Sequence, residues 1–126
     1  MDTDTCVWAL RGDARVLTRL RSSSPSAIFV TTMTLAELHF GVLGSRDPDA
    51  NRARVSTFLG PLTVLHFDAD AALAHAEIRW ALRQSPIGER DLVIAAVARV
   101  HGLTLVTGNA REFVRVPDLP VEDWAT

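Results

Sequence analysis

The chain has 126 residues and a formal net charge of −2 at pH 7, with 48% hydrophobic and 22% charged residues. This composition fits one globular domain large enough to bury a core, and the charge argues against a protein that coats nucleic acid through bulk electrostatics. A single cysteine excludes an internal disulfide and an all-cysteine metal site, so a reducing cytoplasm is the expected compartment. No apolar run is long enough to span a bilayer, and the N-terminus lacks a secretory signal pattern.

The first third of the chain is predicted to contain two helices and one short strand. Apolar residues at helical spacing indicate an amphipathic helix from Cys6 to Leu20, followed by a serine-rich loop. Ile28 to Thr31 suits a strand, and a second helix is predicted from Thr34 to about Leu43. A strand normally precedes the first helix of an α/β domain, but here only Met1 stands before Asp2. We therefore expect that the first strand is incomplete or that the true start lies upstream.

The middle of the chain adds two helices and one strand. Asp49 to Leu59 suits an exposed helix at the rim of the domain, and a Gly-Pro pair ends it. Leu62 to Leu65 is the next strand candidate. The helix from Ala71 to about Arg83 carries apolar residues, including Leu73 and Trp80, on one side. We interpret this side as core, with a dimer contact as the alternative.

The stretch from Gly88 to Asn109 is the one around which the rest of the chain is organised. After three charged residues it runs almost wholly apolar from Leu92 to Val100 at helical spacing, and His101-Gly102 supplies a helix stop. Leu103 to Val106 then suits a short strand that ends in a turn. A buried helix followed directly by a buried strand is half of a parallel α/β unit.

The alternation of helices with short apolar strands predicts a single α/β domain over residues 1–126. Its expected architecture is a three-layer α/β/α sandwich with a central parallel sheet. Val121 to Trp124 is expected to form a last short edge strand.

Three acidic residues stand where a parallel sheet gathers polar groups at the carboxyl ends of its strands. They are Asp2, Glu37 and Asp91. Each also has a purely structural interpretation. Asp2 would be a disordered terminal residue, and Asp91 a charge favoured by the helix dipole. Glu37 would pair with Thr34 in a capping box.

Taken together, the three acids indicate a metal site suited to phosphodiester hydrolysis. Hard divalent cations such as Mg²⁺ take oxygen ligands, usually one or two carboxylates with water and substrate phosphate. Such an ion activates water and neutralises the charge that develops on the phosphate and the leaving oxygen. A protein without a wide basic patch can therefore act on RNA at one metal-loaded site.

Four stretches follow one another in a characteristic order, and three of them carry these acids. They are Asp2–Gly12, Thr34–Val42, Pro86–Ala96 and Thr104–Phe113. In order and spacing they resemble the four motifs of PIN-domain ribonucleases, specifically the VapC-type toxins of toxin–antitoxin pairs, and Val116–Trp124 also fits. The resemblance implies a parallel sheet flanked by helices and an endoribonuclease site that depends on Mg²⁺ or Mn²⁺.

The resemblance also implies roles for individual residues. It maps the metal-binding acids onto Asp2, Glu37 and Asp91, and the fourth acidic position onto Asn109, an amide without negative charge. The metal would then rest mainly on Asp2 and Asp91, with Glu37 holding the metal-bound water. Asn109 or Glu112 would help to orient water or substrate. Further candidates are Thr3, Asp4 and Thr107 as supports of the ligands, and Arg90, Arg111 and Arg115 as RNA phosphate contacts or simply solvated charges.

The partners follow from the same resemblance. They are an RNA substrate, a second copy of the chain in a homodimer, and a cognate VapB-type antitoxin. The C-terminal segment of such an antitoxin enters the toxin's groove while its N-terminal part binds operator DNA, so the toxin would reach DNA only through it. Attack of water on the RNA phosphate would leave a 5′-phosphate and a 3′-hydroxyl.

Other functions are weighed against this one. Asp2-Thr3-Asp4-Thr5 also fits the DxDx(T/V) signature of haloacid-dehalogenase-like phosphatases, but those enzymes need a lysine and all 13 basic residues here are arginine. The four histidines lack zinc-site spacing, no serine sits in a glycine elbow, and Cys6 is expected in the core. A catalytically weak PIN-like binding module stays open because of Asn109 and the incomplete first strand.

Overall fold

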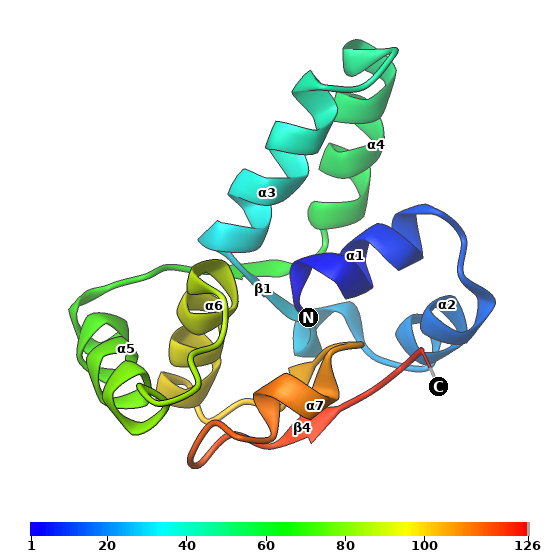
Figure 1. The fold of residues 1–126 in the computed structure, drawn as a ribbon. Coiled ribbons are helices and arrows are strands. Elements are labelled where there is room, and N and C mark those ends of the chain that lie inside the picture. Colours follow the sequence, from blue (N-terminus) through cyan, green and yellow to red (C-terminus); the bar gives the residue numbers. More distant parts are fainter. Residues whose placement is uncertain (126) are drawn as a thin grey trace.

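Short parallel strands lie between helices in the computed structural model, which describes residues 1–125 (Figure 1). The elements follow in the order α1 (Thr3–Leu10), α2 (Ala14–Arg21), η1 (Pro25–Ala27), β1 (Phe29–Thr31), α3 (Thr32–Leu43), α4 (Pro48–Leu59), β2 (Thr63–Leu65), α5 (Ala69–Ala81), α6 (Glu89–Val100), β3 (Leu105–Val106), α7 (Ala110–Phe113) and β4 (Val121–Glu122). The predicted α/β class with parallel strands is confirmed. Among residues 1–125 no helix has the length and apolarity needed to cross a bilayer.

The strands form two parallel pairs. In the first, β1 lies beside β2 with Phe29 opposite Thr63, and in the second, β3 lies beside β4 with Leu105 opposite Val121. We expected one central sheet, but among the described residues no ladder joins β1 to β3. The last strand is the short edge strand that was predicted, although it ends at Glu122.

The first helix differs from its prediction. One helix from Cys6 to Leu20 was expected, but the chain forms α1 and α2 with a turn between them. Gly12 adopts φ +86°, which a residue with a side chain rarely adopts, and this ends the first helix. Asp13 then begins the second, because its carboxylate accepts from the backbone N–H groups of Arg15 and Val16. Cys6 is fully buried, as predicted.

The start of α3 also differs from the capping-box interpretation. Its N-cap is Thr31, whose hydroxyl oxygen accepts from the backbone N–H of Thr34 at 3.2 Å. Glu37 therefore lies in the second turn of the helix, too far along to cap it, and that interpretation of Glu37 is wrong. The α3–α4 hairpin extends away from the strands in Figure 1. Val42 of α3 and Val55 of α4 are buried in it.

The helices α5 and α6 form the other large hairpin (Figure 1). The helix α6 is buried on most sides, and Gly102 after it adopts φ +63°, as expected of a helix stop. On α5 the buried residues are Ala71, Ala74 and Ile78. Leu73 and Trp80 are 66% and 68% exposed, so our interpretation of their side as core is wrong. Ala71, Ala74 and Ile78 face the core instead, and the two alanines let α5 approach α6 closely.

Candidate functional site

Three predicted acids come together from distant parts of the chain. Asp2 is the N-cap of α1, Glu37 lies in α3, and Asp91 lies in the first turn of α6. All three line one cavity of about 490 Å³. The other lining residues are Thr3, Asp4, Gly88, Glu89 and Arg90.

Hydrogen bonds to α1 and to the residue after β3 hold the carboxylate of Asp2 in place. Its Oδ1 accepts from the backbone N–H of Thr5 at 3.0 Å, and its Oδ2 accepts from the hydroxyl of Thr107 at the end of β3. Its own backbone N–H donates to the carbonyl of Val106 at 2.9 Å. With 3% of its surface exposed, Asp2 is an ordered part of the site, and the interpretation as a disordered terminal residue is wrong.

Glu37 is oriented by the hydroxyl groups of Thr3 in α1 and Thr34 in α3. The Thr3 hydroxyl donates to Glu37 Oε1 at 2.6 Å, and the Thr34 hydroxyl lies 3.1 Å from the same Thr3 oxygen. The second carboxylate oxygen of Glu37 lies 3.8 Å from a guanidinium nitrogen of Arg90. Since the Arg90 side chain is 75% exposed, this ion pair is weak and leaves Glu37 free to serve the cavity.

The surroundings of Asp91 raise the pKa of its carboxyl group. Burial, together with the negative charges of Asp2, Asp4, Glu37 and Glu112, raises the pKa of Asp91 from 3.8 to about 6. Burial and the charges of Asp2 and Glu37 also raise the pKa of Asp4. The carboxylates therefore repel one another across the cavity, and a cation placed among them would be attracted.

Asn109 and Glu112 are not among the residues that line the cavity. The backbone N–H of Asn109 donates to the Thr107 hydroxyl oxygen at 2.9 Å, and Asn109 begins α7. Glu112 forms an ion pair with Arg115 at 2.6 Å. Thr107 thus links the turn at Asn109 to Asp2, whereas Glu112 is held in an ion pair with Arg115.

The sequence did not predict that two further acids, Glu89 and Asp4, line the cavity. Glu89 was not singled out at all, and Asp4 was named only as a support. Glu89 shares the first turn of α6 with Asp91, so two acids two residues apart at a helix start were the available signal. Asp4 follows Asp2 by the same interval and enters the cavity from α1.

The donor set suits a hard divalent cation held partly by water. Within residues 1–125 no group of three or more His, Cys, Asp or Glu side chains is arranged to hold a metal ion by itself. Mg²⁺ usually takes one or two protein carboxylates and keeps several waters. The raised pKa of Asp91 and the hydrogen-bonded carboxylate of Asp2 fit that kind of binding.

Comparison with known proteins gives matches over nearly the whole chain. The family model described as PIN domain matches residues 1–119. The tRNA(fMet)-specific endonuclease VapC of Salmonella typhimurium is 35% identical, over 98% of this chain and 96% of that protein. Ribonuclease VapC2 of Rickettsia felis is 34% identical, also over 98% of this chain and 96% of that protein.

Solved structures show the same fold. A chain of the VapBC2 structure from Rickettsia felis, bound to a DNA fragment from its promoter, superposes with a TM-score of 0.91 at 33% identity, covering 98% of this chain and 96% of that chain. DNA-bound VapBC from Salmonella typhimurium gives a TM-score of 0.91 at 35% identity, covering 98% and 95%. The backbone arrangement that brings the acids together is therefore shared with these proteins.

Proposed function

The chain belongs to the PIN-domain family, and we propose that it is the endoribonuclease toxin of a VapBC-type toxin–antitoxin module. The observation that carries this proposal is the convergence of Asp2, Glu37 and Asp91 in one cavity. Their mutual repulsion leaves a site that favours a divalent cation, and RNA phosphate is the substrate class that such a site serves. The proposed compartment is the cytoplasm, where such a toxin would meet both RNA and a DNA-bound antitoxin.

The proposed mechanism assigns a task to each acid. Asp2 and Asp91 would hold Mg²⁺, with Mn²⁺ as the alternative. When bound, the ion would lower the pKa of a water molecule and neutralise charge on the phosphate. Thr5 and Thr107 keep the carboxylate of Asp2 in place, and Glu37 would accept a hydrogen bond from the attacking water. In-line attack would leave a 5′-phosphate and a 3′-hydroxyl.

Among the three candidate arginines, Arg90 is the best placed to contact an RNA phosphate. It lines the cavity, and its weak pair with Glu37 leaves the guanidinium free to move onto an incoming anion. Arg115 is already engaged by Glu112 and by the Ser85 carbonyl, to which it donates at 2.7 Å. Arg111 is exposed on α7 and does not line the cavity.

The proposed partners are a VapB-type antitoxin and a second copy of the chain. An acidic cavity would suit a basic segment of the antitoxin, which would block RNA and carry the toxin to operator DNA. Exposed apolar side chains would form the interface of the homodimer. Candidates are Leu73 and Trp80 on α5 and Phe40 and Leu43 on α3. Sedimentation of the antitoxin-free protein would test this state, and a monomer at micromolar concentration would overturn it.

The nuclease proposal is tested by cleavage of a mixed RNA pool that includes tRNA and ribosomal fragments. Wild type and Asp91→Asn are compared in Mg²⁺, Mn²⁺ and EDTA. Asp70→Asn is the matched control, because Asp70 also lies in the first turn of a helix but is exposed and outside the cavity. We expect discrete cuts that need metal, persist in Asp70→Asn and vanish in Asp91→Asn.

Two other outcomes of this cleavage assay would contradict the nuclease proposal. Cleavage that persists in Asp91→Asn would refute the assignment of the site. RNA that binds wild type tightly but is never cut, in any metal, would favour the binding-module alternative.

A further inference from the structure

A second polar cavity adjoins the acid-lined cavity. It has a volume of about 470 Å³, and its walls come from the first turn of α3, from α5 and from α6. Glu89 and Arg90 line both cavities, so the two are neighbours at the start of α6. Met33 and Glu37 make the same link on α3, because they lie one turn apart and line one cavity each. We call this second space the α5 cavity.

Two arginines give the α5 cavity its positive charge. Arg79 is exposed on α5, and no carboxylate of residues 1–125 forms an ion pair with it. Arg90 has only its weak pair with Glu37. Glu89 is the one carboxylate that lines this cavity, so an anion here meets two guanidinium groups and one carboxylate. Guanidinium groups bind phosphate through paired N–H donors, and the α5 cavity therefore favours a phosphate group.

The rest of the lining is apolar or aromatic. Leu92 is buried, and Met33 and Val93 are half-buried beside it. The ring of His75 meets the ring of Phe67 edge-on, with 5.7 Å between the centroids and 79° between the planes, and this contact orients the imidazole. A nucleobase has two apolar faces and a polar edge, and it packs on apolar and aromatic side chains of this kind.

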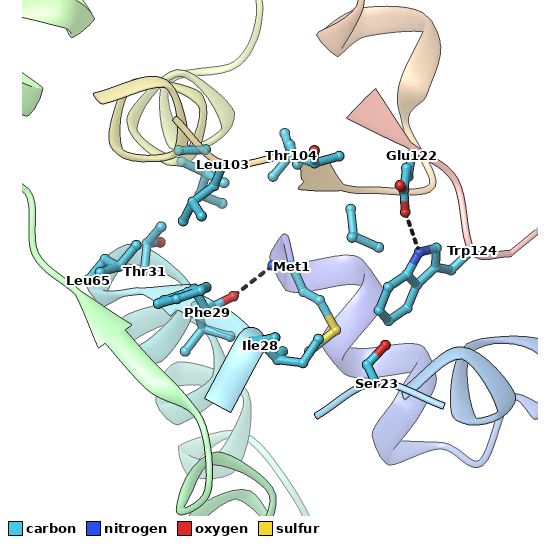
Figure 2. Close-up of a pocket in the computed structure, with 16 residues that line it drawn as sticks. Met1, Ser23, Ile28, Phe29, Thr31, Leu65, Leu103, Thr104, Glu122 and Trp124 are labelled. Carbon is cyan, nitrogen blue, oxygen red and sulfur yellow. Dashed lines mark hydrogen bonds between the residues drawn. The ribbon is translucent and has the colours of Figure 1, made fainter. Parts of the chain in front are cut away.

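The volume and the lining together fit one nucleotide. A cavity of about 470 Å³ lies within the range of roughly 300–1,000 Å³ that is usual for ligand pockets. The cavity drawn in Figure 2 is a contrast, because it measures about 320 Å³ and no arginine is among its lining residues. Only the α5 cavity combines cations with an apolar surface at the edge of the acid-lined cavity.

We propose that the α5 cavity binds the nucleotide next to the scissile phosphate of the RNA substrate, a proposal that rests on the nuclease function proposed above. The phosphate of this nucleotide contacts Arg79 and Arg90. Its base packs on Met33 and Val93, beside the ring of His75. Because this nucleotide lies away from the reacting atoms, Arg79 contributes to RNA binding and to the register of the RNA in the acid-lined cavity, and not to the chemical step.

The first experiment observes the methyl groups of the two methionines by NMR, in protein labelled with carbon-13 at these methyl groups. Met33 lines the α5 cavity, whereas Met1 lines the separate cavity of Figure 2 and serves as the internal control. Nucleoside 5′-monophosphates added in EDTA should shift the Met33 signal and leave the Met1 signal in place. In Arg79→Ala the same shift should need about tenfold more nucleotide, the effect of one hydrogen bond to a charged group. Shifts of both signals, or of neither, would overturn the proposal.

The second experiment measures the salt dependence of RNA binding. A fluorescent RNA that the wild type cuts is bound to Asp91→Asn in EDTA, so that it stays intact. Adding Arg79→Ala should weaken binding about tenfold and reduce the slope of log K against log salt by roughly 0.7, the loss of one phosphate contact on a single strand.

Arg21→Ala is the matched control for Arg79→Ala. Arg21 is also exposed in the last turn of a helix, and no carboxylate in the described part of the chain pairs with it. It lines neither cavity, so its replacement should leave the affinity and the slope unchanged.

The outcomes separate this proposal from the nuclease proposal. Equal slopes in Arg79→Ala and Arg21→Ala would overturn the nucleotide site. Normal RNA binding by Arg79→Ala, with weaker inhibition by the antitoxin, would assign the α5 cavity to a protein segment and would also overturn it. If the wild type cuts no RNA in Mg²⁺ or Mn²⁺, the nuclease proposal is contradicted instead, and the methionine signals alone decide whether the α5 cavity binds a nucleotide.

Discussion

At the scale of single residues, Thr3 acts on the site only through Glu37. Replacing Thr3 with Val removes the hydroxyl that donates to Glu37 Oε1, so the carboxylate should lose its orientation. We expect kcat/KM for RNA cleavage to fall about tenfold, the effect of one hydrogen bond of about 1.4 kcal/mol. Because the Thr3 side chain is half-buried at the edge of the cavity, Tm should change little.

The matched variant is Thr3→Ser, which keeps the hydroxyl and loses only a methyl group. Steady-state cleavage of one defined RNA should show near-normal kcat/KM for Thr3→Ser. Equal losses in both variants would show that the methyl group, and hence packing, is what matters at this position.

The thiol of Cys6 should be inert in the folded protein. It is fully buried in α1, and burial raises its pKa to about 12, so almost no thiolate forms near neutral pH. We expect iodoacetamide at pH 8 to leave the native protein unlabelled and to label one site per chain in urea, as measured by intact mass. Rapid labelling without urea would mean that α1 opens readily.

At the scale of elements, Gly108 makes room for the packing of α1 against the end of β3. A Cβ at this position would lie 2.0 Å from the Trp8 ring, so Gly108→Ala must displace that ring. We expect a loss of about 1–3 kcal/mol in the free energy of unfolding, as for other overpacked sites. Urea denaturation measures this change.

Gly41→Ala is the control for Gly108→Ala. Gly41 lies inside α3, and nothing stands within 4 Å of a Cβ built there. Alanine should therefore stabilise the helix by roughly 0.5–1 kcal/mol. A stabilised Gly108→Ala variant would show that the Trp8 ring moves at no cost.

The same elements show what the sequence could and could not predict. The helix α6 was clear from its apolar run and from Gly102, because both signals are local. The break at Gly12 was hidden, since the apolar spacing continues through it and only the left-handed backbone ends α1. The exposed side of α5 was also hidden, because the partner helix, and not the size of Leu73 or Trp80, decides which face is buried.

At the scale of the whole molecule, the acids of the site could be predicted from the sequence, but their hydrogen-bond partners and pKa shifts could not. The order of four motifs pointed to Asp2, Glu37 and Asp91, and the fold brings these three into one cavity. The Thr3 contact to Glu37 joins residues 34 positions apart, and the Thr107 contact to Asp2 joins residues 105 apart. Such contacts depend on tertiary packing, and so does the raised pKa of Asp91.

That raised pKa makes the stability of the metal-free protein depend on pH. Folding raises the pKa of Asp91 from 3.8 to about 6, so between these values the native state binds more protons than the unfolded state. The stabilisation by this group is complete below about pH 4 and is lost as pH rises through 6. Asp91→Asn removes the charge, so in EDTA at pH 7.5 it should unfold at a higher urea concentration than wild type.

The decisive quantity is the difference between wild type and Asp91→Asn across the pH range, because Asp4 titrates in the same direction in both proteins. In EDTA the urea midpoints should agree near pH 4 and separate between pH 4 and 7. Mg²⁺ should then raise the wild-type midpoint at pH 7.5 and have little effect on the variant, since a ligand stabilises only the state that binds it. Parallel curves at every pH would mean that the charge of Asp91 is already compensated in the folded protein, and a cation would then have no electrostatic reason to bind there.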